Sequence, residues 1–227
     1  MVLPTKRFSD AGLDWGFLVS EPSNNRVSRE QAMIGPVTDR DRIVAGTVFG
    51  TVVLGAATAV PQKAGSNAAN TGTGTIAMDA ATPVLADAAP GVYQVTFTGP
   101  TTFTVEKPNG DQIGEGATGQ AFSDDVKFTI TAGATAFVAG DGFKITVAPG
   151  SGLNVPLSIA ALNGGQIATK IIGRGLPASA QAQRGSFVTG PGVEVNGNLL
   201  LWPAGISAQQ KAACEQQLAA KGIKVRY

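Results

Sequence analysis

A run of short β-like segments in the middle of the chain separates two outer pieces of different character. It extends from about residue 67 to residue 147, and small-residue hinges flank it at 64–66 and 149–152. An inserted domain must leave and re-enter its host at neighbouring surface points, which such hinges permit. The sequence therefore predicts an inserted domain at residues 65–149 and a discontinuous core at residues 26–64 and 150–227.

Alternating apolar and polar residues predict that the insert is built of strands. The alternation is clear at 92–97, 103–105 and 128–130. The intervening turns carry Pro-Asn-Gly-Asp at 108–111 and Ala-Gly-Asp-Gly at 139–142, where glycine supplies the positive φ of a tight turn. Six or seven short strands within roughly 80 residues are typical of a small β-sandwich of immunoglobulin-like size.

The outer pieces predict further strands and one helix. Ser207 is placed as N-cap with Gln210 completing a capping box, and Gly222 follows the helix at 208–221. Strands are expected at 31–34, 47–54, 155–159, 167–172, 187–195 and 223–227. The expected fold class is mainly β: a small β-rich core with one C-terminal α-helix, an inserted β-sandwich domain and an extended N-terminal arm.

Residues 43–60 form an uncharged stretch that includes the small-residue pattern Gly46-Thr-Val-Phe-Gly50. A membrane-spanning helix is one interpretation of such a stretch. Its three glycines, three threonines and other β-branched residues fit two strands better. The sequence favours strands, and we expect no membrane partner.

Residues 1–25 lack a regular apolar period although they carry several large apolar side chains. We interpret them as an arm, with Gly16–Ser20 as the element that docks on another protein. Terminal segments are usually mobile unless other parts of the fold tie them down. The alternative is that this short stretch is an ordinary edge strand of the chain's own fold.

Charge is distributed unevenly although the net charge is only +1. Residues 66–149 hold eight acidic residues against three lysines, a net of −5, and the remainder carries +6. Opposite signs on two parts of one chain indicate different surroundings, with the basic part facing an acidic partner. The basic residues are scattered and lack interleaved aromatics, so direct binding to nucleic acid is not expected.

The sequence offers little for catalysis. It contains no histidine, one cysteine (Cys214), and none of the glycine-rich motifs of hydrolases, P-loop enzymes or dinucleotide folds. Asp39-Arg-Asp41 is interpreted as a solvated turn, and Cys214 as a small apolar filler. Asp124-Asp125 and Asp141 are read as hairpin-turn residues, with a weak Ca²⁺ site as the alternative. We expect no enzyme activity, cofactor or metal.

Cysteine usage and the amino-terminal sequence also bear on location. A single cysteine cannot make an internal disulfide, and residues 1–7 lack the apolar run of a secretory signal. Both observations predict synthesis in a reducing cytoplasm.

Several short motifs resemble lambda-type bacteriophage head decoration proteins, also called cement proteins. FLVSE at 17–21, SRE at 28–30 and AGTVFG at 45–50 resemble the amino-terminal half of these proteins. VEVN at 193–196, LLWP at 200–203 and the helix up to Gly222 resemble the carboxy-terminal half. The resemblance covers roughly residues 16–60 and 153–227, and the middle is similar to β-rich inserts of longer family members.

The resemblance implies a viral structural protein that forms a homotrimer on the outer surface of an expanded phage head. Its partner would be the major capsid protein, and it would be made in the cytoplasm of a bacterial host. An amino-terminal arm of the family adds to a sheet of the capsid protein and clamps neighbouring subunits. Carried onto this chain, the capsid-binding residues would be Phe17, Leu18, Val19, Ser20, Glu21 and Arg29. The arm interpretation adds Trp15, which lies in the stretch 1–15 that has no counterpart in the family.

The carboxy-terminal motif supplies a second set of candidate residues, Leu201, Trp202 and Pro203. Trp202 precedes the capped helix and fits either a core anchor or a hot spot between subunits. Leu201 and Pro203 flank it and are expected to share its contacts.

Two other functions remain open at this stage. The inserted β-sandwich could act as a host-attachment or carbohydrate-binding module on the virion. A hydrolase that uses only carboxylates is the second alternative, although no aromatic-rich cleft is evident.

Overall fold

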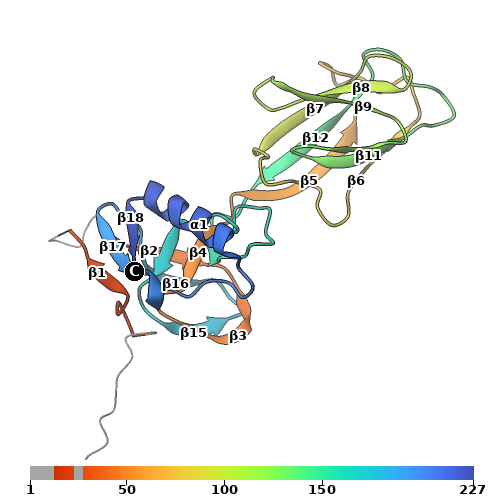
Figure 1. The fold of residues 1–227 in the computed structure, drawn as a ribbon. Coiled ribbons are helices and arrows are strands. Elements are labelled where there is room, and N and C mark those ends of the chain that lie inside the picture. Colours follow the sequence, from red (N-terminus) through yellow and green to blue (C-terminus); the bar gives the residue numbers. More distant parts are fainter. Residues whose placement is uncertain (1–12, 23–27) are drawn as a thin grey trace, which may run out of the picture. The chain divides into compact units, whose positions relative to one another are not determined.

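The computed structural model describes residues 13–22 and 28–227, and the chain forms two compact units. Unit 1 comprises the chain up to Val52 and from Gly152 onwards, and unit 2 comprises Val53–Ser151. Strands dominate both units, and the described residues contain a single α-helix near the carboxyl end (Figure 1). This agrees with the mainly β fold class expected from the sequence.

A closed five-stranded barrel forms the centre of unit 1. Neighbouring residues on its strands face opposite sides: Val48 belongs to one apolar cluster and Phe49 to another. The pairs Ile171/Ile172 and Phe187/Val188 are divided between the same two clusters, so both faces of the barrel are buried at these positions. In barrel order the strands are β13 (Asn154–Pro156), β2 (Arg29–Ile34), β16 (Gln183–Val188), β14 (Lys170–Ile172) and β4 (Val48–Thr51).

A three-stranded sheet and the helix α1 (Ala208–Ala220) cover one of these clusters. The sheet order is β1 (Leu18–Ser20), β17 (Val193–Asn196) and β18 (Ile223–Arg226), with a short 3-10 turn η1 (Gly197–Leu199) after β17. α1 begins at the capping box of Ser207 and Gln210 and buries Cys214 and Leu218. Gly222 ends this segment with φ +82°, a value that favours glycine.

The remaining sheet of unit 1 has two strands, β3 (Val37–Ile43) and β15 (Leu176–Ser179). Val37 and Ile43 are buried at the two ends of β3, whereas all five residues between them are exposed. The expectation of a solvated turn at Asp39–Asp41 is therefore wrong. These residues are solvated, but they continue a strand that pairs with β15.

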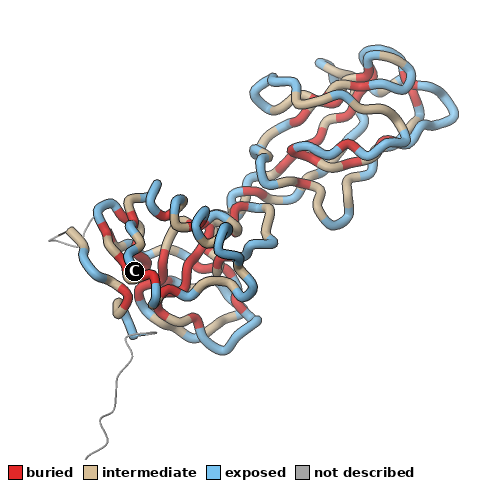
Figure 2. Tube along the Cα trace, in the orientation of Figure 1, coloured by how far each residue is buried: buried red, intermediate tan, exposed pale blue. Residues whose placement is uncertain are grey.

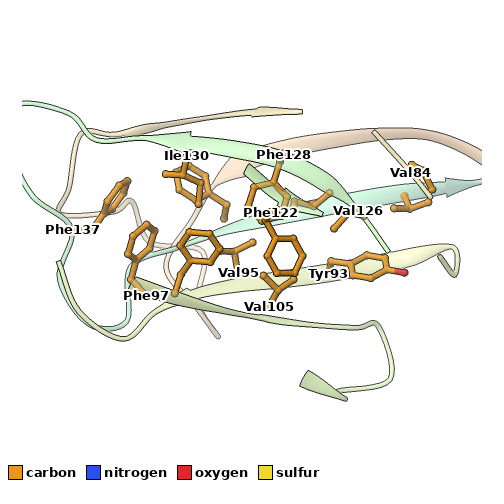
Figure 3. Packing of buried hydrophobic residues seen from close by; sticks show 14 of the residues in the cluster. Val84, Tyr93, Val95, Phe97, Val105, Phe122, Val126, Phe128, Ile130 and Phe137 are labelled. Atoms are coloured by element: carbon orange, nitrogen blue, oxygen red, sulfur yellow. The ribbon is translucent and has the colours of Figure 1, made fainter. Parts of the chain in front are cut away.

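Unit 2 consists of two antiparallel sheets that share one apolar core (Figure 3). The larger sheet has the order β5 (Leu54–Pro61), β12 (Gly142–Pro149), β7 (Gly91–Phe97), β8 (Thr102–Glu106) and β9 (Gln112–Ala117). The smaller sheet has the order β10 (Ala121–Ser123), β11 (Lys127–Thr131) and β6 (Thr75–Met78). Buried positions alternate with more exposed ones along β7, β8 and β11 (Figure 2), so the apolar residues of these strands face inward.

The boundary between the units falls earlier than residue 65, where the sequence analysis placed it. Residues 54–61 form β5, which pairs with β12 from Leu54↔Pro149 to Phe143↔Pro61 and therefore belongs to unit 2. The stretch 43–60 accordingly forms β4, β5 and their connection. Within the described ranges, no helix is long and apolar enough to cross a membrane.

Candidate functional site

Residues 13–22 pack on unit 1 and do not form a separate arm. Phe17 is 2% exposed within the cluster that also contains Val195 and Ile223. Its carbonyl accepts a hydrogen bond from the Asn196 amide (2.8 Å), and β1 pairs with β17. In residues 13–22 the structure therefore supports the alternative interpretation, an edge strand of the chain's own fold, and not the expected separate arm. The rest of the expected arm, residues 1–12 and 23–25, lies outside the described residues.

Three of the predicted capsid-binding residues meet in one cluster, which we call the clasp: Trp15, Glu21 and Arg29, joined by Ser28. The guanidinium carbon of Arg29 lies 4.0 Å from the centroid of the Trp15 ring. Its Nε donates to Glu21 Oε2 (2.9 Å), and its second nitrogen pairs with the other carboxylate oxygen. The Ser28 hydroxyl also donates to Glu21 (2.9 Å), so one carboxylate connects the segments before and after residues 23–27.

The backbone of Trp15 is held in an unfavourable conformation, with φ +62°. Its amide donates to the Gly173 carbonyl (2.7 Å), and its ring lies where a side chain at Gly173 would be, 2.0 Å from an ideal Cβ. Asp14 adds hydrogen bonds from the Gly175 amide (2.8 Å) and Arg174 Nε (3.3 Å). A strained residue persists only where surrounding contacts hold it in place. Residues 14–22 are therefore fixed at several points on unit 1.

The charge of Glu21 is stabilised inside the clasp. Hydrogen bonding from Arg29 lowers the pKa of Glu21, and the Ser28 hydroxyl acts in the same direction, while partial burial opposes both. The carboxylate therefore stays ionised at neutral pH and keeps its bonds to Arg29. The clasp is weakened only as pH falls through this lowered pKa.

Val19 and Ser20 remain available to solvent, in contrast to Phe17. The Val19 side chain is 57% exposed, and β1 is the edge strand of its sheet. Among the described residues, no second strand pairs with the outer edge of β1. An edge strand presents unpaired backbone groups that another chain can use. The predicted arm therefore divides into a buried anchor (Phe17), the partly exposed clasp and an exposed edge.

The carboxy-terminal candidates, Leu201, Trp202 and Pro203, lie on a separate groove of unit 1, which we call the β3 groove. It has a volume of about 670 Å³, and none of residues 13–22 lines it. Leu201 is 40% exposed and hydrogen-bonds through its backbone with Gly46 and Val48 (2.9 and 3.2 Å). Another wall is formed by β3, which the sequence analysis did not predict as a strand.

Trp202 combines a packing role with an unpaired polar group. Its ring packs against the cluster that contains Leu200 and Leu218, as expected of a core anchor, and Lys211 lies 5.7 Å from its centroid. The Trp202 Nε1 is the single buried side-chain nitrogen or oxygen without a hydrogen-bond partner among the residues described. Such groups are uncommon in folded proteins because an unpaired buried donor costs free energy.

The acidic residues of unit 2 have structural partners. Asp141 accepts hydrogen bonds from the backbone amides of Thr71, Gly72 and Val138 (2.9 to 3.1 Å). Asp125 accepts from the Tyr93 hydroxyl and pairs with Lys107, both at 3.0 Å. Across residues 13–22 and 28–227, no group of three or more metal-ligating side chains comes together. These carboxylates therefore hold loops and strands in place.

Comparison with known proteins gives a match over nearly the whole chain. The family model described as "Bacteriophage lambda head decoration protein D" matches residues 14–223, which include most of both pieces of unit 1 and all of unit 2. No curated protein sequence matches the chain.

Solved structures show partial likenesses only. A crystal structure of Xanthomonas campestris FlgL is 24% identical with a TM-score of 0.30, over 44% of this chain and 31% of FlgL. The flagellar hook junction protein FlgK from Burkholderia pseudomallei is 21% identical with a TM-score of 0.29, over 57% of this chain and 21% of FlgK. The chain thus spans less than a third of the length of either protein. The family match, in contrast, covers both units, and the chain belongs to the bacteriophage lambda head decoration protein D family.

Proposed function

We propose that the chain is a non-enzymatic cement protein that binds the outer surface of the phage head as a homotrimer and bridges subunits of the major capsid protein. The observation that carries the proposal is the family match, which runs from residue 14 to residue 223. The +6 charge outside residues 66–149 supports it, because a basic surface favours an acidic partner.

The clasp suggests how capsid binding is organised. Residues 14–22 are fixed on unit 1 by Phe17, by the Arg29–Glu21 pair and by the Trp15 backbone. We infer that residues 1–12 and the free edge of β1 make the capsid contact, and that the clasp sets the point from which residues 1–12 start. Addition of a strand at an edge derives its affinity from backbone hydrogen bonds.

Trimer formation would multiply this contact. Three modest contacts on one rigid particle raise the effective concentration of each, and avidity gains of about 10²–10⁴ are typical of such linkage. A protein that binds the assembled shell and not the free subunits stabilises the shell by mass action.

We propose that unit 2 is an immunoglobulin-like sandwich that points away from the shell. Its two antiparallel sheets around one core support this, as does the excess of acidic residues in its sequence. Its removal is feasible, because the chain leaves and re-enters unit 1 at Val52 and Gly152, which are joined by a backbone hydrogen bond of 2.9 Å.

Two deletions test the proposal. The intact protein, a variant lacking residues 1–12, and a variant with residues 53–151 replaced by a short Gly-Ser linker are mixed with undecorated heads and sedimented. We expect the intact protein and the linker variant to bind and the truncated variant to remain in solution as a folded trimer. Light scattering checks the trimer. Failure of the intact protein to bind heads would refute the cement function. Normal binding without residues 1–12 would refute the role of that segment in the capsid contact.

A further inference from the structure

The β3 groove has the properties of a second binding site. Both odd-numbered and even-numbered residues of β3 line it, among them Val37, Thr38, Asp39, Arg40 and Arg42. Side chains of a strand alternate between its two faces, so a wall that includes both sets follows an edge of the strand. No residue of β15 lines the groove, which places the groove along the edge of β3 that β15 leaves free.

This edge is suited to receive another strand. β3 is seven residues long, and within the described part of the chain β15 is its only strand partner. A two-stranded sheet is marginally stable by itself, and an added strand supplies further backbone hydrogen bonds. The facing wall offers apolar contacts through Ile159 and Leu201, which are 37% and 40% exposed. It also contains Trp202, whose unpaired Nε1 would gain an acceptor if this wall rearranged on binding.

The charges on β3 specify the occupant. Acidic and basic residues alternate from Asp39 to Arg42, which places the Cβ atoms of the two acidic residues on one face of the strand and those of the two arginines on the other. Asp39 already pairs with Arg40 (2.6 Å). An added strand therefore needs an acidic residue beside Arg42 and, on the opposite face, a basic residue beside Asp41, because opposite charges across strands are favourable.

A second copy of this chain does not meet that requirement through β3 itself. When a twofold axis relates two antiparallel strands, one residue lies directly opposite the same residue of the second copy. If that residue is one of Asp39–Arg42, like charges face each other, which is destabilising. If it lies outside this run, the four charged residues face no residue of opposite charge.

The other edge strands also lack the required alternation. Unit 1 offers β1 and β15 without charge, and β18 with Lys224 and Arg226 on one face. In unit 2, β5, β6 and β10 carry no charged residue and β9 carries only Glu115. No described edge strand of a second copy complements β3, which favours another protein as the occupant.

We propose that the β3 groove binds an extended segment of the capsid shell protein, with alternating acidic and basic residues, that adds to the free edge of β3. This rests on the proposed function, which supplies the shell as the partner. It deepens that function because the segment enters a groove of this protein, in addition to the contact made by residues 1–12 and β1.

A charge exchange that leaves the net charge unchanged tests the pairing. In the double variant Asp41→Arg with Arg42→Asp, both exposed side chains change sign and each would face a like charge on the bound segment. We expect affinity for undecorated heads to fall by about tenfold or more. The control is Glu106→Lys with Lys144→Glu, a net-neutral exchange in unit 2, for which binding is expected to equal that of the natural protein.

Hydrogen exchange provides a second measurement that does not depend on a variant. Binding to heads should slow exchange of the amides in residues 37–43 of the natural protein, because an added strand accepts their hydrogen bonds. Unchanged exchange there, or full head binding by the double variant, would overturn the groove proposal while the proposed function stands. Loss of the trimer in the double variant would assign the groove to a second copy and also overturn it. Failure of the natural protein to bind heads would refute the proposed function itself.

Discussion

Unit 2 packs two sheets against each other around seven aromatic side chains, whereas the described part of unit 1 fully buries three phenylalanines in two smaller clusters. In unit 2 the rings of Phe97 and Phe137 stack with centroids 3.9 Å apart, and buried carboxylates hold the loops. Unit 1 instead combines a closed barrel with an exposed two-stranded sheet and the β3 groove. Unit 2 therefore gathers its apolar residues into one core between two sheets, while unit 1 divides them between two clusters and leaves the charged strand β3 exposed.

The largest expected effect follows from removing a ring at the centre of unit 2. Phe97 is 1% exposed and contacts Phe137, Phe103 and Phe143. Phe97→Ala should lower the free energy of unfolding of unit 2 by about 3–5 kcal/mol and leave unit 1 unchanged. Denaturant titration followed by hydrogen exchange in each unit measures the free energy of unfolding of unit 1 and of unit 2. Val92→Ala, on the exposed side of β7, is the control and should change stability by less than about 0.5 kcal/mol. Equal losses in both units would show that they unfold together.

The fold of unit 2 was the part most open to prediction from sequence. Alternation along Val92–Phe97 and Phe128–Ile130, together with glycine turns, is a local signal that survives in the structure. The capped helix is local in the same sense, because Ser207 and Gln210 are three residues apart. Such features depend on neighbours in the chain, which the sequence shows directly.

The features of unit 1 that the sequence analysis misplaced depend on distant residues. Phe17 is buried by Val195 and Ile223, and nothing near residue 17 in the chain indicates that contact. The run Asp39–Arg42 resembles a turn because a charged strand exposed on both faces lacks the usual apolar alternation. The buried residues at its ends, Val37 and Ile43, were the available signal. The β3 groove could not be foreseen, since its walls come from three separate segments.

A buried carboxylate gives the next largest effect, again confined to unit 2. Burial raises the pKa of Asp141, but the amides of Thr71, Gly72 and Val138 outweigh it, so the pKa is lowered overall. Asp141→Asn should reduce the free energy of unfolding of unit 2 by about 1.5–3 kcal/mol, because a charged acceptor is replaced by a neutral one. Stability from this residue is present above its unfolded pKa and lost as pH falls through the folded one. Acid titration of both proteins should therefore show their stabilities converging at low pH.

A smaller effect is expected at the start of α1 in unit 1. The Ser207 hydroxyl accepts from the Gln210 amide (3.2 Å), and the Gln210 side chain accepts from the Ser207 amide (2.9 Å). Ser207→Ala should cost about 1 kcal/mol, measured by denaturant unfolding of unit 1. Gln209→Ala, at an exposed position that makes no part of the cap, serves as the control. An equal loss in both variants would contradict a specific capping role.

The smallest effect tests whether the charge of Glu21 helps to hold residues 14–22 on unit 1. Glu21 and Arg29 are partly exposed, so Glu21→Gln should lower the free energy of unfolding of unit 1 by only about 0.5–1 kcal/mol. The lowered pKa of Glu21 predicts that this difference disappears as pH falls and the natural carboxylate takes up its proton. Asp39→Asn removes an ion pair on the exposed β3 and should leave stability unchanged. A pH-independent loss in Glu21→Gln would mean that packing, and not the charge on the carboxylate, holds residues 14–22 in place.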